Sequence, residues 1–338
     1  MYAHLQRKLL LATCIALAAC QSAGERAAIH APALSISDSA PVAVEAARLL
    51  RTDAFDRVEL DGRGLRLLDR NGQVLTQLSG RFEGLDQREG EAGLLLATVE
   101  RKRQQAMLVG LNNDGQWSEP LFLPRTAFAI EGLCLFRDAG RNDFLFLVGE
   151  EGIGEQWLVG NGGQLLGEAR RVRGLSLPPA SGHCQVDDET ARLFVNEERV
   201  GLWAYPADAE APLERVPVDL RAPFGGLEEG AADMALVPGG VLLLDAEASA
   251  LHLYQEQADG WHAVGALALE GFDEPEQISP RATPQGLELL LVDDAGSRQA
   301  TLDWVPRPLE RKQPLPLLPA EGESGPVPSL GDAADDPA

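Results

Sequence analysis

The chain has 338 residues, of which 29 are basic and 52 acidic, so its formal net charge is −23. Such an acidic surface repels nucleic acid and anionic membrane surfaces, which argues against both as partners. Clustered carboxylates on loops instead suit Ca²⁺, whose ligands are oxygen atoms, although most of these acids are expected on a solvated surface.

The N-terminus predicts an export signal. Arg7 and Lys8 precede the apolar run Leu9–Ala19, which is too short to cross a bilayer as a finished helix. The run ends in small residues, as cleavage sites do. We therefore expect residues 1–19 to be removed as a signal peptide.

The residues around Cys20 predict a lipid anchor. Leu17-Ala18-Ala19-Cys20 resembles the bacterial lipobox, which implies cleavage before Cys20 and lipidation of its sulfur. Gln21, in place of Asp, implies sorting to the outer membrane, facing the periplasm or the cell surface. Residues 20–38 would then form a flexible tether. The alternative is an ordinary secretory signal in which Cys20 is incidental.

Residues 39–305 show the pattern of an all-β domain. Short apolar runs such as Gly93–Val99, Phe144–Val148 and Gly240–Leu244 alternate with Asn-Gly or Asp-Gly turns, as at Asn71-Gly72 and Asp114-Gly115. Sustained helical periodicity is absent. Many short strands with regular turns indicate a sandwich, a barrel or a propeller.

A repeat distinguishes among these folds. Phe82–Leu85, Phe-Glu-Gly-Leu, recurs as Ile130–Leu133, Ile-Glu-Gly-Leu. Weaker copies begin near positions 42, 181, 231 and 275. One four-stranded propeller blade needs roughly 40–50 residues, and the copies are spaced accordingly, so the six copies predict a six-bladed β-propeller.

Two features of this region remain open in the sequence. Cys134 and Cys184 are the cysteines that follow Cys20, and they could form a disulfide in an oxidising compartment or remain two buried thiols. Asp187, Asp188 and Glu189 could hold a metal, but we expect them at a turn between strands.

From residue 306 the composition changes to a Pro-rich, acidic linker that extends to residue 330. Pro314–Pro319 and Glu321–Pro326 carry most of its Pro, Glu and Gly. Such composition is typical of linkers between domains.

Three motifs resemble those of the β-propeller phytases. Residues 148–157, Val-Gly-Glu-Glu-Gly-Ile-Gly-Glu-Gln-Trp, are similar to the signature Thr-Gly-Lys-Glu-Gly-x-x-Glu-Gln-Tyr. Residues 182–189 resemble Glu-Gly-x-x-Ala-Asp-Asp-Glu, and residues 192–203 resemble Leu-Tyr-x-x-Glu-Glu followed by a Trp-containing pair. The order and spacing of the three motifs agree with the family from Val148 to Trp203.

The resemblance implies an activity and a cofactor. Phytases of this family have six blades and several Ca²⁺ ions, and they remove phosphates from phytate, inositol hexakisphosphate. Calcium held by carboxylates would neutralise phosphate oxygens and lower the pKa of a bound water. Phytate and lower inositol phosphates are accordingly the expected small-molecule partners.

Part of the family's site is retained in this sequence. Glu151 matches an active-site Glu, and Arg101 matches a phosphate-binding Arg through a shorter alignment. Glu197 and Glu198 match a Glu-Glu pair that contributes to calcium binding. The resemblance therefore implies Glu151 and Arg101 as catalytic positions and Glu197 and Glu198 as candidate Ca²⁺ ligands.

Other family positions are lost. Glu150 replaces a Lys, Gly182 replaces a Glu, Glu131 replaces a Tyr, and residues 230–233 replace an Asp-x-Glu-Gly calcium motif. Since Ca²⁺ takes about six to eight oxygen ligands, these losses should disrupt the shared cluster. We therefore expect this propeller to be weakly catalytic or inactive.

The C-terminal octet, residues 331–338, resembles the opening of another phytase domain. Its sequence is Gly-Asp-Ala-Ala-Asp-Asp-Pro-Ala. The resemblance implies a tandem arrangement in which a degenerate propeller precedes a catalytic one. Two functions follow as hypotheses: an accessory propeller of a phytase, or a non-enzymatic lipoprotein propeller that binds a partner or ligand at the cell envelope.

Overall fold

The computed structural model describes residues 32–308 apart from 53, 92 and 273. The expected signal peptide and the predicted lipidation site Cys20 lie outside the described residues. So do residues 309–338, which include most of the predicted linker and the phytase-like octet.

The described chain is all-β, as predicted, and forms six four-stranded antiparallel sheets. In chain order the strands are β1 (Leu34–Ile36), β2 (Ala46–Leu49), β3 (Arg57–Asp61), β4 (Gly64–Leu68), β5 (Val74–Ser79), β6 (Phe82–Gly90), β7 (Gly93–Glu100), β8 (Gln105–Asn112), β9 (Leu121–Phe122), β10 (Gly132–Arg137), β11 (Asn142–Gly149), β12 (Ile153–Asn161), β13 (Gln164–Ser176), β14 (Cys184–Asp187), β15 (Arg192–Glu197), β16 (Gly201–Pro206), β17 (Val216–Leu220), β18 (Asp233–Val237), β19 (Gly240–Asp245), β20 (Ala250–Gln257), β21 (Gly260–Ala268), β22 (Gln277–Thr283), β23 (Gly286–Asp293) and β24 (Gly296–Leu302). In this described part of the chain, no helix is long and apolar enough to cross a membrane.

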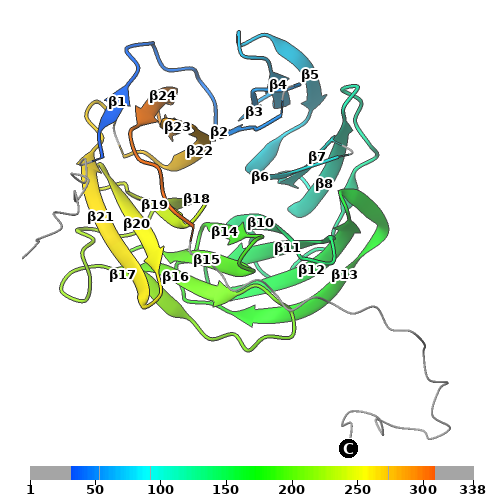
Figure 1. The fold of residues 1–338 in the computed structure, drawn as a ribbon. Helices are drawn as coiled ribbons and strands as arrows, with labels where there is room; N and C mark the ends of the chain where they lie inside the picture. The colour runs from blue at the N-terminus through cyan, green and yellow to red at the C-terminus, as the bar shows by residue number, and fades with distance from the viewer. Residues whose placement is uncertain (1–31, 53, 92, 273, 309–338) are drawn as a thin grey trace, which may run out of the picture.

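The six sheets are arranged in a ring (Figure 1). In blades 1–5, four consecutive strands run from the inside of the ring outwards, starting at β2, β6, β10, β14 and β18; blade 6 starts at β22. Neighbouring innermost strands contact each other all round the ring. Each predicted repeat unit falls at or just before the start of an innermost strand, so the repeat correctly marked the six blades.

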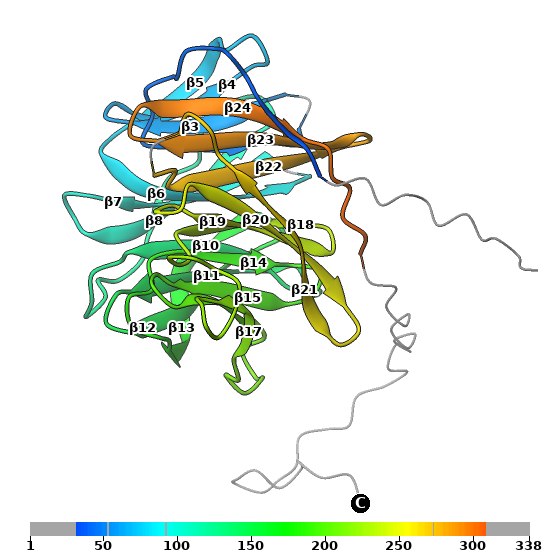
Figure 2. The same ribbon diagram turned by 90° about the vertical axis from the view of Figure 1, so that its left-hand side faces the viewer.

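The N-terminal strand closes the ring. β1 pairs antiparallel with β24 and becomes the outermost strand of blade 6, with Leu34 opposite Leu302. In Figure 2 the blue N-terminal segment accordingly lies beside the orange β24. Residues 34–36, which we expected within the tether, are therefore part of the propeller.

Hydrophobic cores lie between neighbouring blades. Inner strands are buried on both faces, as in β19, whereas outer strands such as β5 alternate between exposed and half-buried positions. The interface between blades 1 and 2 contains Leu60, Leu67 and Leu96 among its buried residues. Each blade is thus stabilised by its two neighbours, and closure of the ring completes the last interface.

That last interface, between blades 6 and 1, has the smallest apolar core among the described residues and includes an ion pair. Its buried apolar residues are Ala47, Leu49, Leu290 and Val292. Arg281 of β22 adds an ion pair to Asp56, with Nη1 2.8 Å from Oδ1.

Deleting residues 32–38 from the chain is expected to lower the free energy of unfolding by about 2 kcal/mol, because blade 6 loses its outer strand and three backbone pairings. Urea unfolding measures this change. Replacing Ser37 and Ser39 with Ala, just beyond β1, is the matched control and should change stability by less than about 0.5 kcal/mol. An unchanged midpoint after the deletion would contradict closure by β1.

Candidate functional site

The four positions implied by the phytase resemblance lie at one end of the ring. We call this end the B–C face, because the turns between the second and third strands of every blade lie there. Arg101 is in the turn after β7, Glu151 is in the turn after β11, and Glu197 and Glu198 follow one another at the end of β15. The structure therefore brings them to one face, on three successive blades.

Arg101 is already paired with acids. Its Nη2 lies 2.9 Å from Glu45 Oε2, and its Nε lies 3.2 Å from Glu83 Oε2. Glu45 precedes the inner strand of blade 1, and Glu83 lies on the inner strand of blade 2. The guanidinium thus bridges two blades, and a phosphate group would have to compete with both carboxylates.

Glu197 is also engaged. The indole Nε1 of Trp203 donates a hydrogen bond to Glu197 Oε2 at 2.8 Å, and Arg215 Nη1 lies 3.8 Å from the same oxygen. Arg215 in turn stacks on the Trp203 ring. Glu198 and Glu151 are exposed in their turns.

These residues do not fit a calcium cluster. Within the described ranges, no three His, Cys, Asp or Glu side chains are grouped so that they could hold a metal ion. Glu197 is the more buried of the two candidate Ca²⁺ ligands, and its Oε2 faces the indole N–H of Trp203 and the guanidinium of Arg215. A Ca²⁺ ion bound at this oxygen would have to displace both groups.

At the positions where the phytase resemblance would place further acids, backbone groups bind a buried amide. Asn196 Oδ1 accepts hydrogen bonds from the backbone N–H groups of Gly182 and His183, at 2.9 and 2.7 Å. Its Nδ2 donates to the carbonyl oxygens of Ala231 and Ala232. One buried amide therefore connects the segments that enter blades 4 and 5, where the phytase family places calcium ligands.

A histidine and a buried aspartate lie next to this amide. His183 Nδ1 is 3.7 Å from Asp233 Oδ1, and Asp233 Oδ2 accepts a hydrogen bond from the Ile278 backbone N–H at 3.0 Å. Asp233 is 1% exposed. Its carboxylate is thus buried and forms a hydrogen bond between blades 5 and 6.

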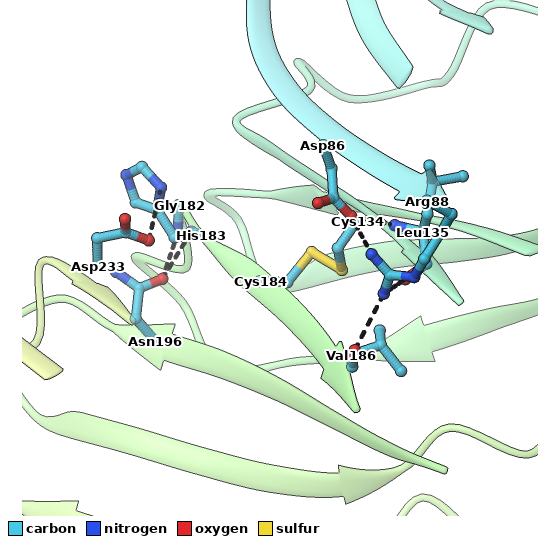
Figure 3. Close-up of a disulfide and its surroundings, with 10 residues drawn as sticks. All are labelled: Asp86, Arg88, Cys134, Leu135, Gly182, His183, Cys184, Val186, Asn196 and Asp233. Carbon is cyan, nitrogen blue, oxygen red and sulfur yellow. Dashed lines mark hydrogen bonds and ion pairs between the residues drawn. A yellow bond between two sulfur atoms is a disulfide. The ribbon is translucent and has the colours of Figure 1, made fainter. Parts of the chain in front are cut away.

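A disulfide joins Cys134 of β10 to Cys184 of β14, which settles the pairing that the sequence left open. It connects the innermost strands of blades 3 and 4. Figure 3 shows it between two polar groups, His183 with Asp233 on one side and Asp86 with Arg88 on the other.

The second group centres on a partly buried arginine whose contacts span three blades. Arg88 of β6 pairs with Asp86 on its own strand (Nη1 to Oδ2, 3.2 Å) and with Asp188 beyond β14 (Nε to Oδ2, 2.9 Å). Its Nη2 also donates to the carbonyl oxygens of Leu135 and Val186 (Figure 3). No motif in the sequence pointed to this group, because Leu135 and Asp188 lie 47 and 100 positions from Arg88 along the chain.

The charges of this group perturb each other. Burial of the carboxyl raises the pKa of Asp188, and attraction to Arg88 offsets this only in part. Burial opposes the charge of Arg88, but Asp86 and Asp188 outweigh it and raise the pKa of the guanidinium. Asp188, which the sequence offered as a metal ligand or a turn residue, is thus a structural partner of Arg88.

A cavity of about 410 Å³ opens beside this group at the opposite end of the ring. We call this end the A–B face, because the turns between the first and second strands of each blade lie there. The innermost strands of blades 1, 2, 4, 5 and 6 line the cavity, and Arg88 itself forms part of the wall. The cavity is thus the mouth of the central channel. It lies at the opposite end of the strands from the turns that contain Arg101, Glu151, Glu197 and Glu198.

Comparisons with known proteins identify no family. No family model and no curated protein matches the chain, so the phytase resemblance stays a prediction. Among solved structures, a functionally unknown protein from Desulfotomaculum acetoxidans DSM 771 is 12% identical, covers 69% of this chain and 73% of that one, and has a TM-score of 0.49. A chain of a nidogen/laminin complex is 11% identical, covers 73% and 97%, and has a TM-score of 0.47. The six-bladed assignment rests on the strand pairing of the chain itself.

Proposed function

We propose that this chain is a phytase-like propeller that has lost catalysis and serves at the cell envelope as the accessory domain of a phytate-degrading enzyme. Its lipid anchor at Cys20 would hold it in the outer membrane. A catalytic propeller following residue 338 would release phosphate from phytate with Ca²⁺, and this propeller would support it.

The main support for the proposed loss of catalysis is that Glu197 is already bound by other side chains of the protein. Its Oε2 accepts from Trp203 and faces Arg215, while Arg101 is held between Glu45 and Glu83. Both groups that the family would use for calcium and phosphate are therefore neutralised within the protein. The phytase-like octet at residues 331–338 supports the accessory role.

Phosphate release from phytate by the full chain tests the loss of catalysis. We expect no release above background with either Ca²⁺ or EGTA. Turnover that EGTA abolishes, and that Glu151→Gln also abolishes, would sink this part of the proposal. Glu119→Gln, at an exposed loop position of blade 2, is the matched control substitution.

The accessory role has a separate test. The coding sequence should continue past Ala338 with Ile-Trp and a further propeller that keeps the calcium motifs missing here. A stop codon directly after Ala338 would overturn the accessory role and favour the alternative, a lipoprotein propeller that binds its own ligand or partner.

A further inference from the structure

A groove of about 510 Å³ lies between blades 2 and 3 on the A–B face, away from the channel mouth. Six of the described residues that line it are glycines: Gly90, Gly93, Gly110, Gly162, Gly163 and Gly167. A glycine adds no side chain to a wall, so a ligand can approach the backbone closely. The volume of the groove is in the size range of small-molecule sites.

Trp117 supplies this groove with an aromatic ring in a fixed position. It is half-buried in the segment between β8 and β9, and it packs against the core between blades 1 and 2. Its Nε1 donates a hydrogen bond to Thr76 Oγ1 of β5 at 3.0 Å. Because this N–H is already used, a ligand in the groove contacts Trp117 through the ring carbons.

Two side-chain amides line the groove from different blades. Gln116 precedes Trp117 in blade 2, and Gln164 begins β13 in blade 3. Both side chains are exposed, and neither has a hydrogen-bond partner in the part of the chain that the structure describes. An amide both donates and accepts hydrogen bonds, so each can pair with a hydroxyl group in either role.

The charges around the groove favour a neutral ligand. Of the lining residues that the structure describes, Glu119 alone is charged, and it is exposed to solvent. Two arginines beside the turn between β12 and β13 already face acids, Arg137 with Asp143 at 2.7 Å and Arg141 with Glu91 at 3.8 Å. An anion would therefore find no cation in the lining, and a cation would find a single solvated carboxylate, which contributes little.

We propose that this groove binds a neutral saccharide. One face of a sugar ring stacks on Trp117, and hydroxyl groups at the ring edge form hydrogen bonds with Gln116 and Gln164. A pyranose ring combines an apolar C–H face with an edge of hydroxyl groups, and the groove offers the matching aromatic ring and amides. The site is independent of the proposed phytase-related function, because it lies at the opposite end of the strands from Arg101 and Glu151.

Calorimetric titration of the full chain with trisaccharides tests this site. The neutral probes are maltotriose, cellotriose and triacetylchitotriose, and trigalacturonate is the anionic counterpart. We expect at least one neutral probe to bind with a Kd of about 1 mM or below, and trigalacturonate to bind at least tenfold more weakly than that probe. Failure of all three neutral probes to bind at about 10 mM, or equal affinity for trigalacturonate, would overturn the proposal.

Substitutions in the groove locate the bound sugar. Trp117→Leu should weaken binding at least tenfold, because the stacking surface is lost. Gly167→Leu should weaken binding to a similar extent without changing Trp117, since a Cβ at Gly167 meets no described atom within 4 Å and the added side chain occupies open groove. Gly265→Leu is the matched control and should keep the wild-type affinity. Gly265 also lies on an outermost strand, β21 of blade 5, and a Cβ there has the same open surroundings.

Circular dichroism checks that each variant is folded. If Trp117→Leu is unfolded because it also loses the hydrogen bond to Thr76, the comparison of Gly167→Leu with Gly265→Leu decides the question. A folded Gly167→Leu protein that binds the trisaccharide with the wild-type affinity would refute the placement of the sugar in this groove. An equal loss of affinity in Gly265→Leu would refute it as well.

Discussion

Arg88→Met is expected to lower the free energy of unfolding by about 3–5 kcal/mol, as for other buried ion pairs that lose one partner. The substitution keeps most of the side-chain volume but removes the guanidinium. Asp86, whose side chain is 5% exposed, then remains as a buried carboxylate without its cation. The carbonyl oxygens of Leu135 and Val186 lose a donor in the same step. Urea unfolding at neutral pH measures the change.

We expect this large effect because the ion pair of Arg88 is largely buried, and the loss of an exposed arginine should not produce it. Arg63 also pairs with an aspartate, Asp61, but its side chain is 72% exposed. Arg63→Met should therefore change stability by less than about 1 kcal/mol. Adding Asp86→Asn to Arg88→Met should recover part of the loss, because the unpaired charge disappears. A loss below about 1 kcal/mol for Arg88→Met would show that the three-blade contact contributes little.

Reduction of the Cys134–Cys184 disulfide is expected to lower the free energy of unfolding by about 2–4 kcal/mol. The two cysteines are 50 residues apart in sequence, and the chain-entropy model assigns about 4 kcal/mol to a loop of that length. Both cysteines are buried on innermost strands, so the bond also holds blades 3 and 4 together at the channel. Urea unfolding with and without dithiothreitol measures the effect without changing any side-chain volume.

The double substitution Cys134→Ala and Cys184→Ala provides the control for this result. It should unfold near the midpoint of the reduced protein, and dithiothreitol should not lower its midpoint further. Labelling of Cys134 and Cys184 by a thiol reagent in the unfolded but unreduced chain would contradict the disulfide.

The recurrence of Phe82–Leu85 at Ile130–Leu133, together with its weaker copies, was enough to predict the six blades. Each unit marks the start of an innermost strand because every blade has to begin at the channel and carry apolar residues on both sheet faces. Closure was not predictable in the same way. β1, at Leu34–Ile36, is only three residues long and lies in a polar stretch, so its pairing with β24 follows from the open edge that the ring leaves.

In the candidate site, too, the sequence predicted which residues are present, whereas their contacts depend on the tertiary structure. Arg101, Glu151 and the Glu197-Glu198 pair were found by local motif similarity, and the structure places them on neighbouring turns of one face. That Glu197 is engaged by Trp203 and Arg215 depends on the folding of β15 against β16 and on the chain that enters β17. A motif records residue types, whereas the availability of a carboxylate depends on its spatial neighbours.

The sequence by itself determined the all-β class, the number of blades and the acidic surface, because these depend on composition and on patterns that repeat once per blade. Only the tertiary structure decided the ring closure, the disulfide, the Arg88 contacts and the cavity beside Arg88. The physical reason is that each of these brings together segments that lie far apart in the sequence. Residues such as Arg88 and Asp188 are 100 positions apart, and only the curvature of the closed ring brings their charges within hydrogen-bonding distance.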